Sequence, residues 1–339
     1  MGKVYWLAAA VVAVIAGLSA ARADTLADVQ ARGMLKCGTS DKLPGFSFID
    51  DKGQRVGFEI DNCRAIAAAV LGDANKMEAV PLVPRDAFTT LGSGGVDVFV
   101  DRATWTFLRS TQLGFNYGGV YFYDGEGFMV KKSSGIASVN QLDQATICVT
   151  QGTTSELNIA DYFGTHKMRY QLVTYADPDE SRRAYEAGRC DAWSIDRTVL
   201  ASRGLAMAHR EDQVILPEII SREPLGPMVR KGDDRWHDIV FWVLNLRVAT
   251  EALGITSANV DEQRSSSSNP EVQRILGVTG DFGKALGLSN DWGYQSIKQV
   301  GNYGETFERY LGRGTPLGLD RGATALWRDG GLMYPLPFR

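Results

Sequence analysis

Residues 146–163 read TICVTQGTTSELNIADYF and combine a short strand, a tight turn and the start of a helix. The β-branched run Thr146–Thr150 predicts a buried strand, and Gly152 can adopt the positive φ that a tight turn requires. Thr153 and Thr154 follow where the helix is expected to begin. Because a helix N-terminus presents unpaired N–H groups and the positive end of the helix dipole, this turn suits a small carboxylate. The alternative is that the hydroxyl groups only cap the helix.

The chain on both sides of this turn alternates strands with helices, which is the pattern of an α/β fold. Before the turn, we expect strands at Met34–Thr39, Met77–Val83 and Val96–Val100, and helices at Thr25–Arg32, Phe58–Leu71 and Arg85–Leu91. After the turn, we expect a helix at 155–164, strands at 170–174 and 190–195, and helices at 178–187 and 197–203. The pattern therefore predicts two α/β lobes. Segments near 124–131 and 221–229 are expected to cross between them as a two-strand hinge.

The last third of the chain is predicted to be helical. Apolar periodicity predicts helices at Asp234–Leu253, Pro270–Leu276 and Asp291–Leu311, the last one interrupted at Gly301–Gly304. Arg264–Asn269 contains four serines in a row and is expected to be a mobile loop.

The N-terminus has the features of a secretory signal. Lys3 precedes an apolar run of twelve residues, Leu7–Leu18, and Ala21-Arg22-Ala23 is a small-x-small cleavage site, so the mature chain should begin at Asp24. The mature 316 residues would then hold 34 of the 36 basic residues and all 40 acidic ones. This mild acidity argues against nucleic acid and anionic membrane surfaces as partners.

The four cysteines, Cys37, Cys63, Cys148 and Cys190, all lie in the mature part. An even number in an exported protein favours disulfides, and three pairings are possible. We favour Cys37–Cys63 with Cys148–Cys190, because these bonds would lie within each half and leave the halves free to move. A zinc site is the rival, but no CxxC pair exists and the three histidines are scattered.

Chemically distinctive side chains follow three of the predicted strands. Leu43 and Phe46 lie just beyond the first strand, Arg109 lies shortly after the strand at 96–100, and Asp196 ends the strand at 190–195. Ligands of open α/β sheets bind at the carboxyl ends of the strands. Arginine can grip a carboxylate with two parallel hydrogen bonds, and a carboxylate can hold an ammonium. The alternatives are that Leu43 and Phe46 cover the core, that Arg109 pairs with Asp101 at the surface, and that Asp196 caps a helix.

Six segments carry a family resemblance: TWTFLRS (104–110), YDGEGFMVKK (123–132), CVTQGTTSELNIADYF (148–163), AGRCDAWSIDR (187–197), ILPEIISREPLGPMVRKGDDRW (215–236) and NDWGYQSIKQVGNYGETFERYLG (290–312). Together they resemble the periplasmic solute-binding proteins of amino-acid ABC transporters, particularly the general L-amino-acid-binding branch of the polar amino-acid family.

The resemblance implies an α/β, two-lobed periplasmic-binding-protein fold of type II, with a mixed, mostly parallel sheet in each lobe and a two-strand hinge. Residues 1–23 would be the signal peptide. Residues 24–126 and 226–339 would form lobe 1 with a C-terminal helical extension, and residues 127–225 would form lobe 2. The resemblance further implies a periplasmic monomer that captures L-amino acids and delivers them to a membrane ABC permease through transient contacts. It implies no cofactor, no metal and no catalytic activity.

The family's site residues fall on specific positions of this chain. The carboxylate arginine falls on Arg109, its hydroxyl and backbone donors fall on Thr104, Thr153 and Thr154, and the ammonium-binding aspartate falls on Asp196. The further candidate ligand contacts are Gln151, Asp101, Arg102, Leu43 and Phe46.

One departure from the family pattern concerns the segment before Thr104. A Ser-Arg-Asn-Thr run is expected in this branch, and the chain has Val100-Asp101-Arg102-Ala103 instead. A carboxylate at Asp101 could weaken anion binding, neutralise Arg109 or select a basic side chain.

The rival function is a periplasmic dehydratase-like enzyme on the same fold. It would need a general acid or base in the cleft, for which Asp101 or Glu156 can be proposed. No Ser/His/Asp or Cys/His set is visible in the sequence, so we expect a binding protein and not an enzyme.

Overall fold

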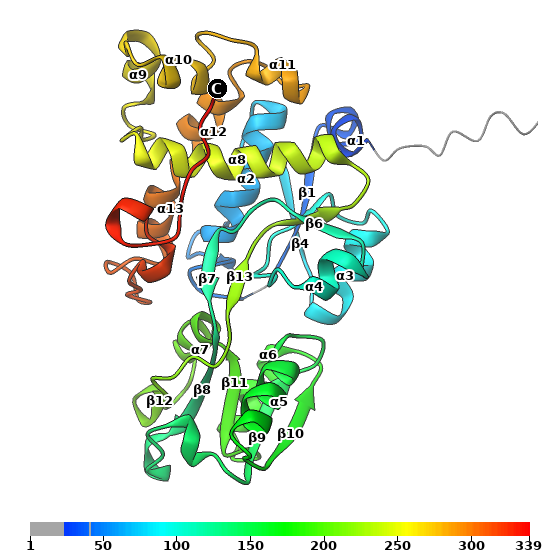
Figure 1. Ribbon diagram of the computed structural model, residues 1–339, viewed down its shortest axis with the longest axis vertical. Helices are drawn as coiled ribbons and strands as arrows, with labels where there is room; N and C mark the ends of the chain where they lie inside the picture. Colours follow the sequence, from blue (N-terminus) through cyan, green and yellow to red (C-terminus); the bar gives the residue numbers. More distant parts are fainter. Residues whose placement is uncertain (1–23, 41) are drawn as a thin grey trace, which may run out of the picture.

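The computed structural model describes residues 24–40 and 42–339, so the expected signal peptide (1–23) and Asp41 lie outside the described residues. Figure 1 shows two sheet-bearing lobes joined by extended strands, with a group of helices on the far side of the upper lobe. This is the α/β architecture expected from the alternation of strands and helices. Within the described part of the chain, no helix is both long enough and apolar enough to cross a membrane.

Lobe 1 is built on a five-stranded sheet of order β4-β1-β5-β14-β6. Its strands are β1 (Leu35–Thr39), β4 (Met77–Pro81), β5 (Val98–Phe99), β6 (Phe115–Tyr117) and β14 (Met228–Arg230). β1 runs parallel to β4 and β5, and β14 runs antiparallel to β5 and β6. The helices are α1 (Thr25–Arg32), α2 (Phe58–Leu71), α3 (Pro84–Gly92) and α4 (Phe107–Thr111), and a small hairpin joins β2 (Phe48–Ile49) to β3 (Arg55–Val56).

Lobe 2 repeats this arrangement with a sheet of order β10-β9-β11-β8-β12. Its strands are β8 (Glu126–Lys131), β9 (Ala145–Thr150), β10 (Tyr170–Tyr175), β11 (Ala192–Asp196) and β12 (Gln213–Ile215). β9 is parallel to β10 and β11, and β8 is antiparallel to β11 and β12. The helices are α5 (Ser155–Thr165), α6 (Pro178–Glu186) and α7 (Arg197–Gly204), with 3₁₀ turns at Lys132–Ser134, Val139–Gln141 and Arg210–Asp212.

The two crossing segments form a separate two-stranded sheet between the lobes. β7 (Phe122–Asp124) pairs antiparallel with β13 (Glu223–Leu225), so Asp124 lies opposite Glu223. β8 begins two residues after β7, which carries the first crossing segment directly into the sheet of lobe 2. The pairing matches the two-strand hinge that the sequence predicts.

The C-terminal third packs on lobe 1 as a layer of helices (Figure 1). It contains α8 (Asp234–Ala252), α9 (Val260–Ser266), α10 (Pro270–Ile275), α11 (Phe282–Leu286), α12 (Trp292–Val300) and α13 (Tyr303–Tyr310), followed by 3₁₀ turns at Gly322–Thr324 and Trp327–Asp329. The expectation of a loop over 264–269 was wrong for its first half, because residues 264–266 complete α9. The hydroxyl groups of Ser265 and Ser266 donate to the carbonyl of Glu262, which satisfies them within the helix.

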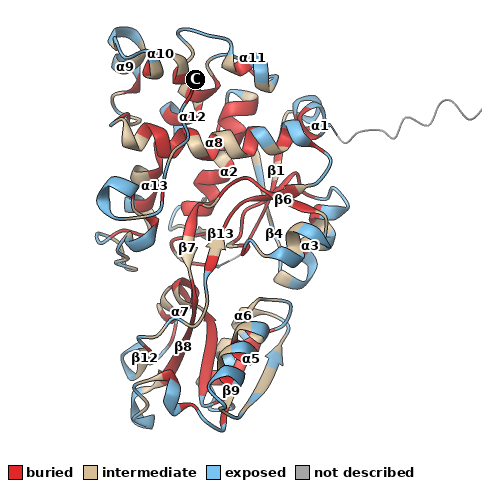
Figure 2. Cartoon of the chain, in the orientation of Figure 1, coloured by how far each residue is buried: buried red, intermediate tan, exposed pale blue. Residues whose placement is uncertain are grey.

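Each lobe has its own apolar core and its own disulfide. Buried residues occupy the central strands of both sheets and the inner sides of α2 and α8, whereas α5 and α6 turn exposed faces to solvent (Figure 2). The disulfides are Cys37–Cys63 in lobe 1 and Cys148–Cys190 in lobe 2, which is the pairing favoured from the sequence. Each bond ties a sheet strand of its lobe to another segment of the same lobe, so neither bond links the two lobes.

Candidate functional site

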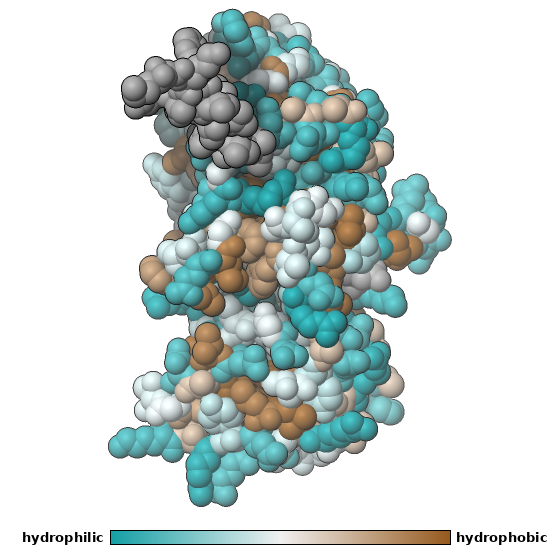
Figure 3. Space-filling model, turned by 90° about the vertical axis from the view of Figure 1, so that its right-hand side faces the viewer, coloured by the Kyte–Doolittle hydropathy of each residue, from teal (hydrophilic) through white to brown (hydrophobic). Residues whose placement is uncertain are grey.

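A cleft between the lobes gathers residues from the carboxyl ends of strands in both sheets. The cleft is open to solvent and is lined by residues of both lobes. Its lining residues are Pro84, Ala87, Phe88, Phe99, Asp101, Arg102, Ala103, Thr104 and Arg109 from lobe 1, and Gly152, Thr153, Thr154, Ser155, Pro178, Ile195, Asp196 and Val199 from lobe 2. On the face shown in Figure 3, apolar side chains occur on both lobes, above and below the region where the lobes meet.

Arg109 and Thr104 lie on the lobe 1 wall of the cleft. The Nη1 of Arg109 donates to the carbonyl of Thr104 at 2.9 Å, and its guanidinium lies 4.9 Å from the centre of the Phe88 ring. The hydroxyl of Tyr117 donates to the same carbonyl at 2.6 Å. These contacts fix the guanidinium in a partly apolar setting, where a bidentate pair with a carboxylate is stronger than in water. Arg109 is not paired with Asp101 among the described contacts.

The turn before α5 contributes the opposite wall. Gly152 has φ 78°, as its predicted role in a tight turn requires. Thr154 is the N-cap residue of α5, but its side chain makes no capping hydrogen bond. Instead, its hydroxyl donates to Glu223 at 3.3 Å, and the hydroxyl of Thr153 donates to the carbonyl of Thr150 at 2.8 Å. The Oγ1 of Thr153 accepts a long hydrogen bond of 3.4 Å from the N–H of Ser155, so Thr153 and not Thr154 contacts the start of α5, which lines the cleft.

Asp196 lies at the junction of β11 and α7, also on the cleft wall. It occupies the N-cap position of α7, yet its side chain makes no capping hydrogen bond, so the capping interpretation of Asp196 is wrong for the side chain. Its carboxylate is grouped with those of Glu126 and Glu223, with one oxygen of each within 4.8 Å of the others. Such oxygens can surround a cation, either a metal ion or a ligand ammonium.

Burial, together with nearby negative charges, makes Asp196 and Glu126 costly to ionise. Burial, followed by the nearby charges of Asp124, Glu223 and Glu126, raises the pKa of Asp196 well above its usual value, against a smaller lowering effect of Arg102. Burial also raises the pKa of Glu126 to about 7, although hydroxyl groups of Ser194 and Ser155 hydrogen-bond to its carboxylate. An ammonium placed among these groups would relieve the repulsion.

Asp101 and Arg102 form an ion pair at the base of the lobe 1 wall. The Nη2 of Arg102 lies 2.7 Å from Oδ1 of Asp101, and both side chains are at least nine-tenths buried. Arg102 has φ 44°, an unusual value for a residue with a side chain. Its N–H donates to the hydroxyl of Tyr121 at 2.7 Å, which helps to hold this conformation. The charge of Asp101 is therefore balanced by Arg102.

Three candidate residues do not line the cleft. Leu43 and Phe46 are fully buried in the core of lobe 1, so the core interpretation of both residues holds. The Phe46 ring packs edge-on against Phe122 and lies 5.7 Å beneath the guanidinium of Arg102. Gln151 is exposed, and its backbone N–H donates to the carbonyl of Tyr175.

The sequence reasoning also missed residues that belong to the site. Phe88, Phe99 and Val199 supply apolar walls, and Glu126 and Glu223 supply buried carboxylates. A usable signal was present for Glu126, because it is the only charged residue of the segment 125–130, which otherwise consists of glycine and apolar residues. The apolar residues carried no comparable signal.

Comparison with known proteins gives consistent matches over nearly the whole chain. The family described as bacterial extracellular solute-binding proteins, family 3, matches residues 35–254. The glutamate/glutamine/aspartate/asparagine-binding protein BztA of Rhodobacter capsulatus is 50% identical over 330 residues, covering 97% of each chain. The general L-amino acid-binding periplasmic protein AapJ of Rhizobium johnstonii is 48% identical over 335 residues, covering 98% of this chain and 97% of its own. An ABC transporter periplasmic binding protein from Brucella ovis with glutathione bound superimposes with a TM-score of 0.90 at 48% identity, covering 94% of this chain and all of its own.

Proposed function

The chain belongs to the bacterial extracellular solute-binding proteins of family 3, and from this premise we propose that it captures L-amino acids between its lobes and delivers them to an ABC transporter permease. The observation that supports this most is the distribution of charge in the cleft. Arg109 stands on the lobe 1 wall, and Asp196 with its neighbouring carboxylates stands on the lobe 2 wall. An amino acid carries one charge of each sign a few bonds apart, which fits this polarity.

In the proposed complex, the ligand carboxylate binds Arg109, the Thr104 region and the N-terminus of α5. The ligand ammonium binds Asp196. Each ligand charge is then paired and hydrogen-bonded, which offsets the cost of removing it from water. A few such charge-assisted hydrogen bonds are sufficient for a dissociation constant of about 1 µM, which corresponds to roughly −8 kcal/mol.

Closure of the lobes would couple binding to transport. Contacts to α5 and Asp196 come from lobe 2, whereas Arg109 comes from lobe 1, so a ligand that touches both favours the closed state. We propose residues 24–126 and 226–339 as one rigid body and 127–225 as the other. The closed monomer would then dock transiently on the permease, in the periplasm, after removal of residues 1–23.

A catalytic role has less support than binding. The relatives BztA and AapJ are named as amino-acid-binding proteins. Asp101, one of the two candidate acid–base residues, is held in an ion pair with Arg102. The other, Glu156, does not line the cleft. We therefore propose that the protein releases its ligand chemically unchanged.

Isothermal titration calorimetry with the twenty L-amino acids tests the proposal. Arg109→Ala and Asp196→Ala should each weaken binding of the preferred amino acids by at least ten-fold. Arg169→Ala, which removes an exposed arginine on lobe 2, is the control and should leave affinity unchanged. Unchanged affinity in both site variants would overturn the site assignment, and absence of binding by any L-amino acid would overturn the proposed function. Chromatography of the ligand after incubation with the protein would reveal any product.

A further inference from the structure

Two buried and oppositely charged side chains on the lobe 1 wall of the cleft keep unused hydrogen-bonding atoms. The side chains of Asp101 and Arg102 are 5% and 10% exposed, and both residues line the cleft. Within the described residues, Nε and Nη1 of Arg102 have no hydrogen-bond partner, and Oδ1 of Asp101 has only its 2.7 Å ion pair with Nη2 of Arg102. Buried polar atoms without partners are rare in folded proteins, because each one costs free energy. Their position on the cleft wall therefore points to a polar group that arrives with the ligand.

Glu59 and Tyr121 lie next to this pair, and the protonation state of Glu59 determines the net charge of this part of the cleft wall. Oε2 of Glu59 lies 3.9 Å from Nη1 of Arg102, and the hydroxyl of Tyr121 donates to Oε1 of Glu59 at 3.1 Å. Burial raises the pKa of Glu59 to about 8, against the lowering effect of Arg102, so Glu59 is mostly protonated at pH 7. Asp101 and Arg102 then cancel each other, and this part of the cleft wall is dipolar with no net charge.

A ligand group with a positive or a negative charge is poorly matched to the ion pair of Asp101 and Arg102. A second carboxylate could bind Arg102 but would approach the carboxylate of Asp101, and a side-chain ammonium or guanidinium could bind Asp101 but would approach Arg102. Like charges placed close together in a shielded site repel strongly. A carboxamide carries an oxygen that accepts from Arg102 and an N–H that donates to Asp101, and it carries no charge. A carboxamide can therefore satisfy both residues at once, through two separate atoms.

We propose that Asp101 and Arg102 are specificity-determining residues that recognise a carboxamide in the side chain of the bound amino acid. This inference rests on the proposed function, because the amino-acid end of the ligand is held by Arg109 and Asp196. The amide has two chemical sources. It is the primary amide of a free amino acid such as L-glutamine, or the secondary amide that links a γ-glutamyl group to the next residue of a small peptide.

Calorimetry at pH 7 with L-glutamine, L-glutamate, L-lysine and γ-L-glutamylglycine tests the proposal. At least one of the two amide ligands should bind about ten-fold or more tightly than glutamate and lysine, since glutamate and lysine have a charged group, and no amide, in the side chain. Tight glutamine binding identifies the free amino acid as the source, and tight binding of γ-glutamylglycine alone identifies the peptide. An L-amino acid without an amide that binds more tightly than both amide ligands overturns the inference and leaves the proposed function standing.

The variant Asp101→Asn separates recognition from a merely structural role. It keeps the size of the side chain but leaves the charge of Arg102 unbalanced, so the preference should shift toward glutamate by at least ten-fold relative to glutamine. Asp97→Asn is the matched control, because Asp97 is also a buried carboxylate paired with an arginine, Arg32, but does not line the cleft. The control should keep the wild-type ratio of glutamine to glutamate affinity.

A second variant covers the case in which Asp101→Asn does not fold, as judged by thermal denaturation. Arg102→Gln leaves Asp101 as the charged partner and should shift the preference toward lysine by at least ten-fold relative to glutamine. If the folded variants keep the wild-type order of affinities, Asp101 and Arg102 do not recognise the ligand side chain. The inference is then overturned.

Discussion

Lobe 1 and lobe 2 have the same sheet topology but place opposite charges in the cleft. In each sheet a central strand, β1 or β9, has parallel neighbours on both sides, followed by an antiparallel strand that enters from the hinge. β5 and β11 occupy equivalent positions, and each is followed by a polar segment at its carboxyl end. The segment after β5 leads to Arg109, whereas β11 ends in Asp196. One scaffold used twice thus presents a cation from one side and an anion from the other.

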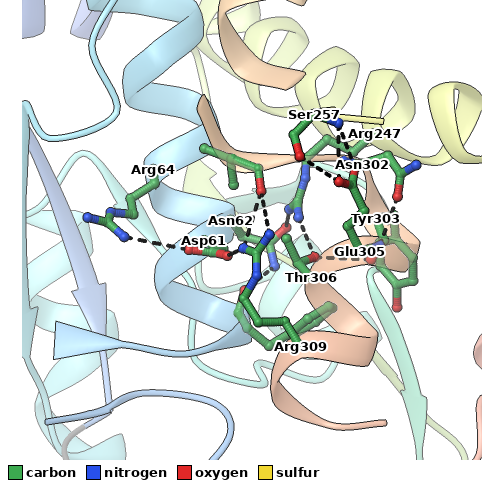
Figure 4. A network of polar contacts seen from close by, with 12 residues as sticks. Asp61, Asn62, Arg64, Arg247, Ser257, Asn302, Tyr303, Glu305, Thr306 and Arg309 are labelled. Atoms are coloured by element: carbon green, nitrogen blue, oxygen red, sulfur yellow. Dashed lines mark hydrogen bonds and ion pairs between the residues drawn. The ribbon is translucent and has the colours of Figure 1, made fainter. Parts of the chain in front are cut away.

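The lobes differ equally in what supports them. Lobe 1 carries the additional helices α8–α13, and a polar network fastens this layer to α2 (Figure 4). Arg247 of α8 is fully buried and donates to Asn62 of α2 at 2.6 Å and to Thr306 of α13 at 2.5 Å. Arg309 of α13 pairs with the buried Asp61 of α2 at 2.6 Å. Lobe 2 has no such layer within the described residues, so its helices α5 and α6 remain exposed on one face (Figure 2).

The comparison indicates that the two lobes differ in their contributions to stability and to ligand binding. Lobe 1 is the larger body, because it carries the additional helices, and we propose that lobe 2 moves relative to it about β7 and β13. Stability should therefore depend most on the network of lobe 1, whereas ligand affinity should depend on residues of both lobes. Four predictions test this division, and their expected effects decrease in size.

Arg247→Ala should produce the largest loss of stability. The change removes a buried cation, leaves the side-chain oxygens of Asn62 and Thr306 without their donor and opens a cavity, which together should cost about 3–5 kcal/mol of unfolding free energy. Chemical denaturation monitored by circular dichroism measures this cost. Arg169→Ala is the control on lobe 2, because its pair with Asp143 is 3.4 Å long and its side chain is 72% exposed. The control should change stability by less than about 0.5 kcal/mol, and a comparable loss in both variants would contradict the special role of the lobe 1 network.

Asp196→Asn should have opposite effects on binding and on stability. Loss of the charge that faces the ligand ammonium should weaken binding about 100-fold, or roughly 2.7 kcal/mol. The free protein should become more stable, because a neutral amide costs less to bury than a carboxylate and is not repelled by Asp124, Glu223 and Glu126. Calorimetry and thermal denaturation measure the two quantities. Asp191→Asn, at the exposed position just before β11, should change affinity by less than about two-fold, and a destabilised Asp196→Asn would argue against the repulsion.

The sequence predicted features that depend on local chemistry. Gly152 indicated the turn before α5, and the observed helix begins at Ser155 as expected. Helices α1 and α2 begin and end at the predicted residues, because their apolar periodicity and the glycines after them mark both helices clearly. Arg109 and Asp196 line the cleft, in agreement with the rule that ligands bind beyond the carboxyl ends of the strands.

Features that depend on long-range packing were not predictable in the same way. Leu43 and Phe46 follow a strand just as Asp196 does, but Phe122 from the hinge packs against Phe46 and keeps it in the core. The grouping of Glu126 with Glu223 arises because distant segments pair at the hinge. A single sequence gives no direct sign of such a contact between segments far apart in the chain.

Ligand affinity should fall as the pH is lowered. The pKa of Asp196 is raised in the free protein by burial and by its carboxylate neighbours, and a bound ammonium would lower it again. Binding therefore releases a proton at pH values between these two pKa values, and affinity drops by up to ten-fold per pH unit below the higher one. Titration calorimetry between pH 5 and pH 8, in buffers of different ionisation enthalpy, measures the proton release. Glu126 and Glu59 titrate in the same range, so the Asp196→Asn variant is the control, and it should lose most of the pH dependence.

Thr324→Val should have the smallest effect, and it tests whether the extension steadies the hinge. Thr324 is buried in the segment after α13, and its hydroxyl oxygen accepts a hydrogen bond from the N–H of Tyr123 in β7 at 3.2 Å. Valine keeps the shape but leaves this N–H unsatisfied, so the unfolding free energy should fall by about 1 kcal/mol. Thr315→Val, whose hydroxyl donates to Gly312 within the same segment and away from the hinge, should cost less.

Ligand affinity distinguishes two roles for this contact of Thr324. If it only anchors the extension to lobe 1, Thr324→Val should change the dissociation constant by less than about three-fold, because β7 still pairs with β13 and no ligand-facing residue is altered. The segment 319–323 and residues of lobe 2 such as Ala201 and Ile219 line a common groove beside the hinge. A ten-fold change in affinity without loss of stability would therefore mean that the extension shifts the balance between open and closed lobes, and that lobe 1 governs the hinge as well as its own stability.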